Sequence, residues 1–180
     1  MFRFDLPGGA HLRLLEESDA DELYALVDRN RDRLAPWMPW VPSTRSPADS
    51  LGFIRLTRRQ IADNDGFQAT IVAGAALAGM VGFHGVNWAN RATTIGYWLD
   101  AAHEGRGTMT EAVRALVDHA FGAWRLRRVV IEAAADNARS RAIPERLGFR
   151  EEGVRRDAQR HGDRYLDIVV YARLATDPAG

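Results

Sequence analysis

A segment near the middle of the chain has the composition of an anion-binding loop. Residues 104–110 read Glu-Gly-Arg-Gly-Thr-Met-Thr. The two glycines permit a tight turn whose backbone N–H groups stay uncovered. At the start of a helix such N–H groups and the helix dipole attract an anion, and Arg106 adds a full positive charge. A structural interpretation is also open, in which Thr108 and Glu111 form a capping box at the head of an ordinary helix.

Two widespread nucleotide-binding loops do not match this segment. A P-loop requires a Gly-Lys pair followed by Ser or Thr, and no Gly-Lys pair follows here. The dinucleotide fingerprint requires a third glycine, where this chain has Thr110, and an acidic residue about twenty positions on, where it reads Trp-Arg-Leu-Arg-Arg-Val-Val. The segment therefore predicts a phosphate cradle of another kind, or only a capped helix start.

A strand must deliver the chain to this loop, and a helix must lead away from it. Residues 93–99 alternate with a period of two, which predicts a strand. Gly96 interrupts it, and a glycine within a strand often marks the close approach of another group. From Met109 to Phe121 apolar residues recur with the spacing of a buried helical face, and residues 128–134 predict a strand buried on both faces. Strand, helix and strand in this order indicate a parallel crossover.

The flanking segments predict further helices and strands. Ser18 is expected to cap a helix that ends near Asn30, and Ser46 with Pro47 opens a second helix with strong start signals. The other expected elements are strands over residues 10–15, 67–73, 77–86, 149–158 and 164–174, and a short helix over residues 140–147.

Aromatic residues and a histidine outside the loop are candidates for a substrate-binding wall. Prolines at positions 36, 39 and 42 repeat every three residues, the period of polyproline II, so Trp37 and Trp40 are expected to share one edge of an extended segment. They either line a substrate site or pack this segment onto the core. His84 and Trp88 lie near the end of a predicted strand, and His84 is either a group on the acceptor side or a structural residue.

The composition limits the classes of protein to which the chain can belong. Its 180 residues are most simply one domain spanning residues 1–180. The formal net charge is zero, with 24 basic and 24 acidic residues, so neither a nucleic-acid nor a membrane partner is expected. There is no cysteine, which excludes disulfides, a thiol nucleophile and thiolate metal ligands, and the five histidines lack ligand spacing, so no metal site is expected. Without a signal peptide or a long apolar run, we expect a cytoplasmic protein.

Two sequence signatures resemble the GNAT family of N-acetyltransferases. The loop resembles the acyl-CoA motif Q/R-x-x-G-x-G/A, with Glu104, Gly107 and Met109 at the marked positions. Residues 136–149, DNARSRAIPERLGF, resemble the second signature, in which an Asn begins the helix beside the pantetheine arm. IGYWL followed by H-x-G-x-G-x-M-T-E-A is similar to the RimJ/RimL-like branch. Met109 is usual in that branch, whereas Glu104 places a negative charge near a pyrophosphate, which Arg106 is expected to offset.

The resemblance implies a fold and a donor substrate. The expected fold is α+β, a single domain with a central mixed sheet that is mostly antiparallel, a parallel pair splayed at the acyl-CoA site, and helices on both faces. Acetyl-CoA is the implied acyl donor, and no metal is required. The residues implied to bind the donor are Tyr97, Trp98, Leu99, Glu104, Gly105, Arg106, Gly107, Thr108, Met109, Thr110, Asn137 and Ser140.

The implied reaction is the attack of a neutral amine on the acetyl thioester. A backbone N–H near Leu99 is expected to stabilise the oxyanion, and Ser140 is implied to protonate the leaving thiolate, or else serves only as a helix cap. The branch uses a glutamate as the base in a segment that here reads Arg-Asp-Ala-Gln, and Gln159 cannot take a proton. Asp157, Glu104 or His84 could act instead, or the amine could arrive already neutral.

We therefore expect an N-acetyltransferase that moves an acetyl group from acetyl-CoA to a primary amine. The acceptor is either a protein N-terminal α-amine, which the resemblance favours, or a small-molecule amine. Its expected binding residues are Trp37, Trp40, His84, Trp88 and Gln159. The alternative is a CoA-binding module without catalysis, in which Gln159 marks the loss of activity. A homodimer is among the oligomeric states that the resemblance allows.

Overall fold

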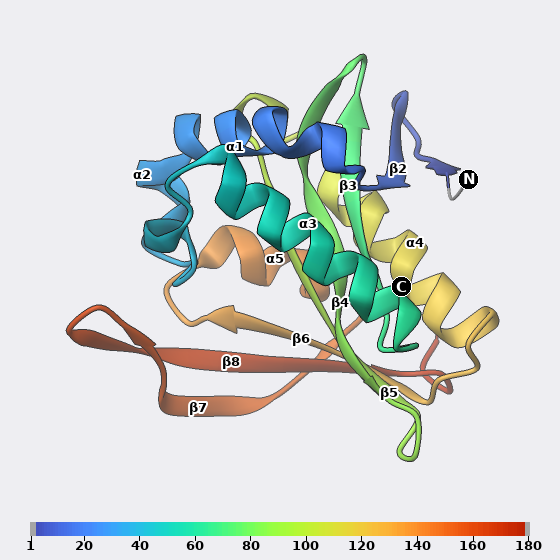
Figure 1. Cartoon of the computed structure of the whole chain (residues 1–180). Coiled ribbons are helices and arrows are strands. Elements are labelled where there is room, and N and C mark those ends of the chain that lie inside the picture. Colours follow the sequence, from blue (N-terminus) through green and yellow to red (C-terminus); the bar gives the residue numbers. More distant parts are fainter. Residues whose placement is uncertain (1–2, 179–180) are drawn as a thin grey trace.

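The computed structural model describes residues 3–178 of the chain. Its helices are α1 (Ala20–Arg29), α2 (Arg31–Leu34), α3 (Pro47–Ala62), α4 (Thr108–Gly122) and α5 (Ala138–Arg146) (Figure 1). Short 3-10 helices are η1 (Glu17–Asp19), η2 (Val41–Ser43) and η3 (Ala101–His103). Its strands are β1 (Arg3–Asp5), β2 (Ala10–Leu14), β3 (Gln68–Ala73), β4 (Ala76–Asn87), β5 (Ala92–Leu99), β6 (Arg128–Ala134), β7 (Arg150–His161) and β8 (Arg164–Leu174).

The described strands form one sheet in the order β1-β2-β3-β4-β5-β6-β8-β7. β5 and β6 run parallel, and every other neighbouring pair runs antiparallel. α4 makes the crossover between β5 and β6, so the predicted parallel crossover and the mostly antiparallel mixed sheet are confirmed. The sequence patterns do not predict β1, because its residues are all exposed and carry no apolar alternation.

The sheet opens where β5 and β6 separate. The two strands pair only where residues 92–95 of β5 face residues 128–131 of β6. Beyond that point β5 stays paired with β4 as far as Leu99, and β6 stays paired with β8 as far as Ala134. The half of the sheet that contains β6, β8 and β7 therefore turns steeply away from the half that contains β3, β4 and β5 (Figure 1). The predicted splayed pair is confirmed, and it leaves a wedge-shaped gap between the C-terminal ends of β5 and β6.

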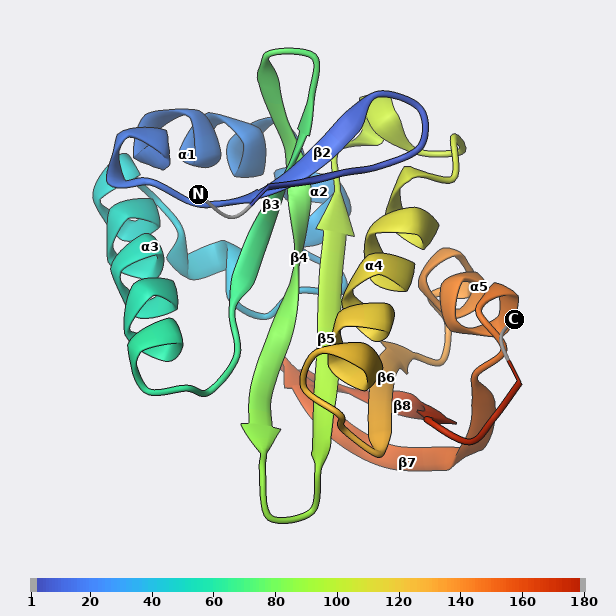
Figure 2. The ribbon, with the colours of Figure 1, turned by 90° about the vertical axis from the view of Figure 1, so that its right-hand side faces the viewer.

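Helices cover both faces of the sheet, as predicted. α1 and α3 lie on one face of the β3–β5 half and α4 lies on the other, while α5 lies next to α4 and packs on β6 (Figure 2). α4 buries Val113, Leu116 and Val117 in the main apolar core, which also contains Ile95 of β5 and Ile131 of β6. Burying each such side chain contributes about 1.5–3 kcal/mol. This packing fixes α4 on the sheet and holds its N-terminus beside the gap.

The segment between α2 and α3 is turned rather than extended. Trp40 has helical backbone angles, with φ −81° and ψ −20°, and η2 begins at the next residue. The N–H of Trp37 donates to the carbonyl of Leu34 at 2.9 Å, which continues the turn of α2. The polyproline II prediction is therefore wrong. Proline's fixed φ suits the first turn of a helix as well as an extended chain, and Pro42 occupies that place in η2.

One of the three helix starts predicted at Ser18, Ser46 and Thr108 is confirmed, and the other two are wrong. Ser46 caps α3, with its hydroxyl oxygen accepting the N–H of Asp49, as predicted. Ser18 does not cap the first helix, since it lies inside η1, which precedes α1. The capping box at Thr108 is also wrong, because the N-cap of α4 is Gly107 and Thr108 is already the first helical residue.

Candidate functional site

The loop before α4 is shaped by its glycines. Gly105 and Gly107 have φ angles of 74° and 78°, a left-handed conformation that residues with a side chain rarely adopt. A Cβ added at either glycine would meet nothing within 4 Å, so the glycines are needed for backbone conformation rather than for space. Met109 and Thr110 point into buried surroundings, which anchors the first turn of α4. The unpaired N–H groups of that turn therefore face an open, exposed loop that suits an anion.

Glu104, at the entrance of this loop, is neutralised by two arginines. Arg33 of α2 forms an ion pair with one carboxylate oxygen, and Arg139 of α5 lies 2.8 Å from the other. Arg33 also donates to the backbone carbonyl of Leu99. The charge that Arg106 was expected to offset is thus offset by Arg33 and Arg139. No local pattern in the sequence indicates this, because the two arginines lie on other helices.

A tyrosine and a serine meet across the gap between β5 and α5. The hydroxyl of Tyr97 donates to the backbone carbonyl of Ser140 at 2.9 Å, and the Ser140 hydroxyl lies 3.4 Å from the same tyrosine oxygen. Pro144 makes this possible, since it lies inside α5 and has no N–H to donate to the carbonyl four residues earlier, that of Ser140. Burial raises the pKa of the Tyr97 hydroxyl far above its ordinary value, so the group stays protonated.

Asn137 begins α5, as the second signature predicts. Its side-chain oxygen accepts the N–H of Ser140 at 3.1 Å, which is the N-cap hydrogen bond of this helix. Ser140 is therefore in the first turn and is not the cap. The purely structural interpretation of Ser140 as a cap is wrong, and its hydroxyl is directed toward Tyr97.

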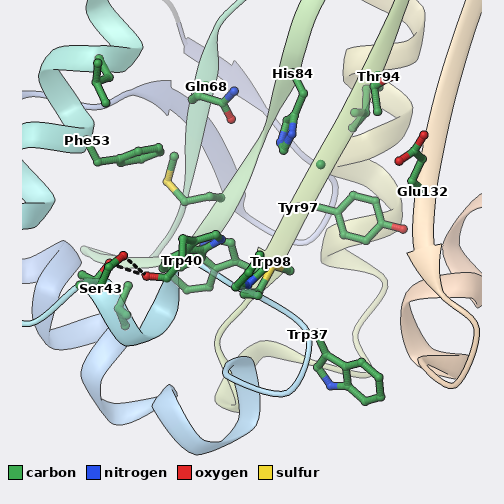
Figure 3. A pocket seen from close by; sticks show the side chains of 18 of the residues that line it. Trp37, Trp40, Ser43, Phe53, Gln68, His84, Thr94, Tyr97, Trp98 and Glu132 are labelled. Atoms are coloured by element: carbon green, nitrogen blue, oxygen red, sulfur yellow. Dashed lines mark hydrogen bonds between the residues drawn. The ribbon is translucent and has the colours of Figure 1, made fainter. Parts of the chain in front are cut away.

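A cavity of about 1090 Å³ adjoins the gap and reaches from α3 to Ser140. One wall is apolar, with Trp40 and Trp98 in contact at a ring-centroid distance of 6.0 Å and Phe53 of α3 beside them (Figure 3). The opposite end is polar and carries Gln68, His84 and Glu132 (Figure 3). Trp40, Phe53 and Leu56 remain 36%, 40% and 61% exposed, so the apolar wall extends to the mouth of the cavity.

The comparison with known proteins identifies the family. The model of the acetyltransferase (GNAT) domain matches residues 10–150. The chain belongs to the GNAT acetyltransferase family. It is 31% identical to the ribosomal-protein-serine acetyltransferase of Escherichia coli (strain K12) over 167 residues, which covers 91% of each chain. It is 39% identical over 171 residues to YdaF of Bacillus subtilis (strain 168), for which ribosomal N-acetyltransferase activity has been proposed, covering 94% of this chain and 93% of YdaF.

Solved structures agree with this assignment. RimL, a ribosomal L7/L12 α-N-protein acetyltransferase solved in complex with coenzyme A, superposes with a TM-score of 0.92 at 27% identity and covers 96% of this chain and 98% of its own. The GNAT domain described here is thus an acyltransferase that uses acetyl-CoA to acetylate an amine. The alternative of a CoA-binding module without catalysis is not favoured, because the relatives are named as acetyltransferases.

The structure brings four of the five residues predicted for the acceptor side together. Trp37, Trp40, His84 and Gln159 all line the cavity. Trp88 does not. Its ring centroid lies 5.7 Å from that of Trp124, and its ring N–H donates to the carbonyl of Asn64, in the turn after α3, at 2.7 Å. Trp88 thus lies outside the cavity lining although it is close to His84 in sequence, since Gly85 adopts a positive φ at a bulge near the end of β4.

Gln159 holds the wall of the cavity together. Its side-chain amide donates to the carbonyl of Trp37 at 3.3 Å. His161 and Arg164, at the tip of the β7–β8 hairpin, contact the carbonyls of Ala35 and Pro36. The hairpin therefore fastens the segment that carries Trp37 across the sheet. Asp157, another candidate for the base, is exposed on β7 and is not part of the cavity lining.

Residues 3–178 contain neither a metal cluster nor a membrane-spanning helix. No three His, Cys, Asp or Glu side chains within this range are grouped closely enough to hold a metal ion. Every helix of the same range is too short or too polar to cross a bilayer.

Proposed function

We propose that this GNAT enzyme acetylates the α-amine at the N-terminus of a protein. The observation that carries the proposal is a cavity of about 1090 Å³ directly beside the splayed gap between β5 and β6. Pockets for small ligands typically measure roughly 300–1000 Å³, so this one has room for the first residues of a peptide chain. The relatives named for ribosomal proteins support the same class of acceptor, and we extend it to residues 1–180 as one acetyltransferase domain.

The donor side suits acetyl-CoA by its shape and charge. The pyrophosphate is assigned to the loop and first turn of α4, where Glu104, Gly105, Arg106, Gly107, Thr108, Met109 and Thr110 follow one another. Positive φ angles at the glycines and the unpaired N–H groups of α4 fit an anion there. The pantetheine arm is assigned to the free edge of β5 at Tyr97, Trp98 and Leu99, and to the start of α5 at Asn137.

The reaction follows from the groups at the inner end of the cavity. The amine nitrogen attacks the carbonyl carbon of the thioester, the carbon–sulfur bond breaks, and a proton must reach the departing sulfur. The Ser140 hydroxyl is assigned as that proton donor, held in place by Tyr97. The backbone N–H at Leu99 is assigned to the developing oxyanion. Binding both substrates in one cavity supplies a large part of the acceleration by proximity.

The acceptor is assigned to the apolar wall and the polar end of the cavity. Trp37 and Trp40 offer flat surfaces to the side chains that follow the amine, and Gln159 positions Trp37. Glu132, which is paired with Arg155, lines the polar end, where its carboxylate is able to accept a hydrogen bond from an ammonium group before that group loses its proton. A homodimer and a cytoplasmic location are the finer expectations that accompany this assignment.

Mass spectrometry of peptides incubated with acetyl-CoA tests the acceptor class. We expect acetylation of free N-terminal peptides at the α-amine, and none of matched peptides whose N-terminus is formylated but whose lysines are free. Acetylation of lysines alone, or of polyamines in preference to every peptide, would contradict the proposal. Thiol release measured in parallel reports any transfer to an amine, whatever the acceptor.

A further inference from the structure

His84 occupies a special place at the polar end of the cavity. Its imidazole lies over Gly96 of the neighbouring strand β5, and a Cβ at Gly96 would stand 2.2 Å from Nε2 of His84 (Figure 3). The ring can take this position only because residue 96 has no side chain. Gly96 was predicted to mark the close approach of another group to the strand, and that group is the imidazole of His84.

The other titratable groups that line the cavity are engaged. Asp49 accepts the N–H of Arg45 and the hydroxyl of Ser46 at the start of α3. Glu132 forms an ion pair with Arg155, and the Tyr97 hydroxyl donates to Ser140. Within residues 3–178, neither ring nitrogen of His84 has a hydrogen-bond partner. His84 is thus the lining group with a free lone pair.

Two further candidates for a base are removed by the structure. Glu104 is held between Arg33 and Arg139 and lies at the donor loop, outside the cavity lining. Asp157 is exposed on β7, also outside the lining.

His84 also has access to water on its other side. It lines a second cavity of about 440 Å³, which is bordered by Asp65, Asn87 and Thr94 and lies at the bulge of β4. His84 and Thr94 line both cavities. A proton that His84 accepts in the first cavity therefore has a route to solvent through the second.

We propose that Nε2 of His84 accepts the proton that the acceptor amine loses during acetyl transfer. The step rests on the proposed function and completes it. The amine nitrogen forms the amide bond to the acetyl carbon, its proton goes to Nε2, and the sulfur leaves with a proton from Ser140. His84 then returns its proton to water and Ser140 is reprotonated.

The surroundings of His84 favour the neutral imidazole that this step needs. His84 is an exposed residue, yet the protein atoms around its ring disfavour the charged form and lower its pKa, which the Glu132 carboxylate on β6 opposes only in part. Arg155 on β7 pairs with Glu132, and Asp65 in the turn after α3 accepts the N–H of Val86. Since a protonated imidazole cannot accept a second proton, activity should fall as the pH drops through the pKa of His84.

The test measures the dependence of kcat/KM on pH for the parent enzyme and for His84→Ala, with a peptide acceptor. The acceptor amine also titrates, with a pKa of about 7.7–8.0, so the parent should show two ionisations on the acid side. In His84→Ala we expect a loss of about 100-fold or more in kcat/KM and an acid limb whose slope falls from about two to about one. Acetyl-CoA affinity should not change, and added imidazole should restore part of the rate.

A matched pair of glycine variants separates chemistry from packing. Gly96→Ala should displace the ring and cost activity with the imidazole still in the protein, whereas Gly122→Ala, at the end of α4 with nothing within 4 Å of the added carbon, should not. Loss of activity in His84→Ala with both ionisations retained and no rescue by imidazole would overturn the proposal. The proposal would also be overturned if the second ionisation on the acid side of the kcat/KM profile were lost in Glu132→Gln and retained in His84→Ala. An inactive parent enzyme that binds acetyl-CoA would refute the proposed function, not this step alone.

Discussion

The donor side and the acceptor side of this enzyme are built in different ways. On the donor side most of the assigned groups run along a short stretch of chain, from the end of β5 through the loop to the first turn of α4, and only Asn137 and Ser140 are added from α5. On the acceptor side, Trp40, His84, Glu132 and Gln159 come from the η2 segment, β4, β6 and β7. A phosphate site can be made by local backbone geometry, whereas a cavity with walls of several kinds requires elements that are distant in sequence.

Charge shows the same contrast. The donor loop contains an acidic residue, Glu104, whose partners Arg33 and Arg139 are supplied by two other helices. In the acceptor cavity His84 has no hydrogen-bond partner among the residues that the structure describes, whereas the carboxylates of Glu132 and Asp49 are already bonded. The acidic residue of the donor side is therefore held in ion pairs, whereas the acceptor side retains His84 as a group that is able to titrate.

The largest expected effect concerns the donor loop. Gly107→Asp should weaken acetyl-CoA binding by about 100-fold or more. The new carboxylate and a phosphate of acetyl-CoA, about 5 Å apart, would repel each other by about 3 kcal/mol at an effective dielectric constant of about 20. Isothermal titration calorimetry measures the affinity. Gly162→Asp is the matched control, since Gly162 also has a positive φ and open surroundings but lies in the β7–β8 turn. An equal loss of acetyl-CoA affinity in Gly107→Asp and Gly162→Asp would contradict the assignment of the donor side.

The next largest effect is expected where the donor and acceptor sides meet, at Ser140 and Tyr97. Ser140→Ala should lower kcat by about 100-fold without weakening acetyl-CoA binding, as expected for the loss of a general acid. Tyr97→Phe should cost about 10-fold, because it removes one hydrogen bond that orients the serine. If Tyr97 acts through Ser140, the double variant should be no slower than Ser140→Ala alone. If steady-state kinetics instead show that the double variant loses activity by the product of the two single losses, Tyr97 acts independently of Ser140.

A pair of tryptophans tests the acceptor side. Trp40 and Trp88 are similarly exposed, at 36% and 39%, but only Trp40 lines the cavity. Trp40→Ala should lower kcat/KM for a peptide acceptor by about 10- to 30-fold, which corresponds to about 1.5–2 kcal/mol of apolar contact, with acetyl-CoA affinity retained. Trp88→Ala should leave acetylation unchanged and lower the free energy of unfolding by about 1–2 kcal/mol. The reverse result in kinetics and denaturant unfolding would show that the acceptor lies elsewhere.

The smallest expected effect sharpens the charge contrast. Glu104→Gln should tighten acetyl-CoA binding a few-fold, about 0.5–1 kcal/mol, because Arg33 and Arg139 lose their carboxylate partner and remain beside the phosphates. The gain should shrink at high salt, which calorimetry at two ionic strengths detects. Glu152→Gln removes a carboxylate paired with Arg128 on the β6–β7 side of the sheet and should have no effect. Weaker binding in Glu104→Gln would mean that the ion pairs shape the loop.

Local sequence patterns predicted the elements that set up the site. The α3 cap at Ser46 and the β5–α4–β6 crossover follow from the types and periodicity of neighbouring residues, whereas the start of α5 at Asn137 was predicted only from the resemblance to the second GNAT signature. The errors arise where two conformations satisfy the same local rule. Prolines suit both polyproline II and the first turn of a helix, so Trp37 and Trp40 were placed on an extended edge that the chain does not form.

Sequence by itself determined the glycine turn of the donor loop, the strand–helix–strand order and the start of α3 at Ser46, because each depends on backbone conformations and periodicities that nearby residues impose. Only the tertiary structure decided that Arg33 and Arg139 hold Glu104, that Tyr97 bonds to the carbonyl that Pro144 leaves free, and that His84 lies over Gly96. These contacts join residues on different elements. Their positions depend on the splay of β5 from β6 and on the packing of α4, which side chains throughout the core determine together.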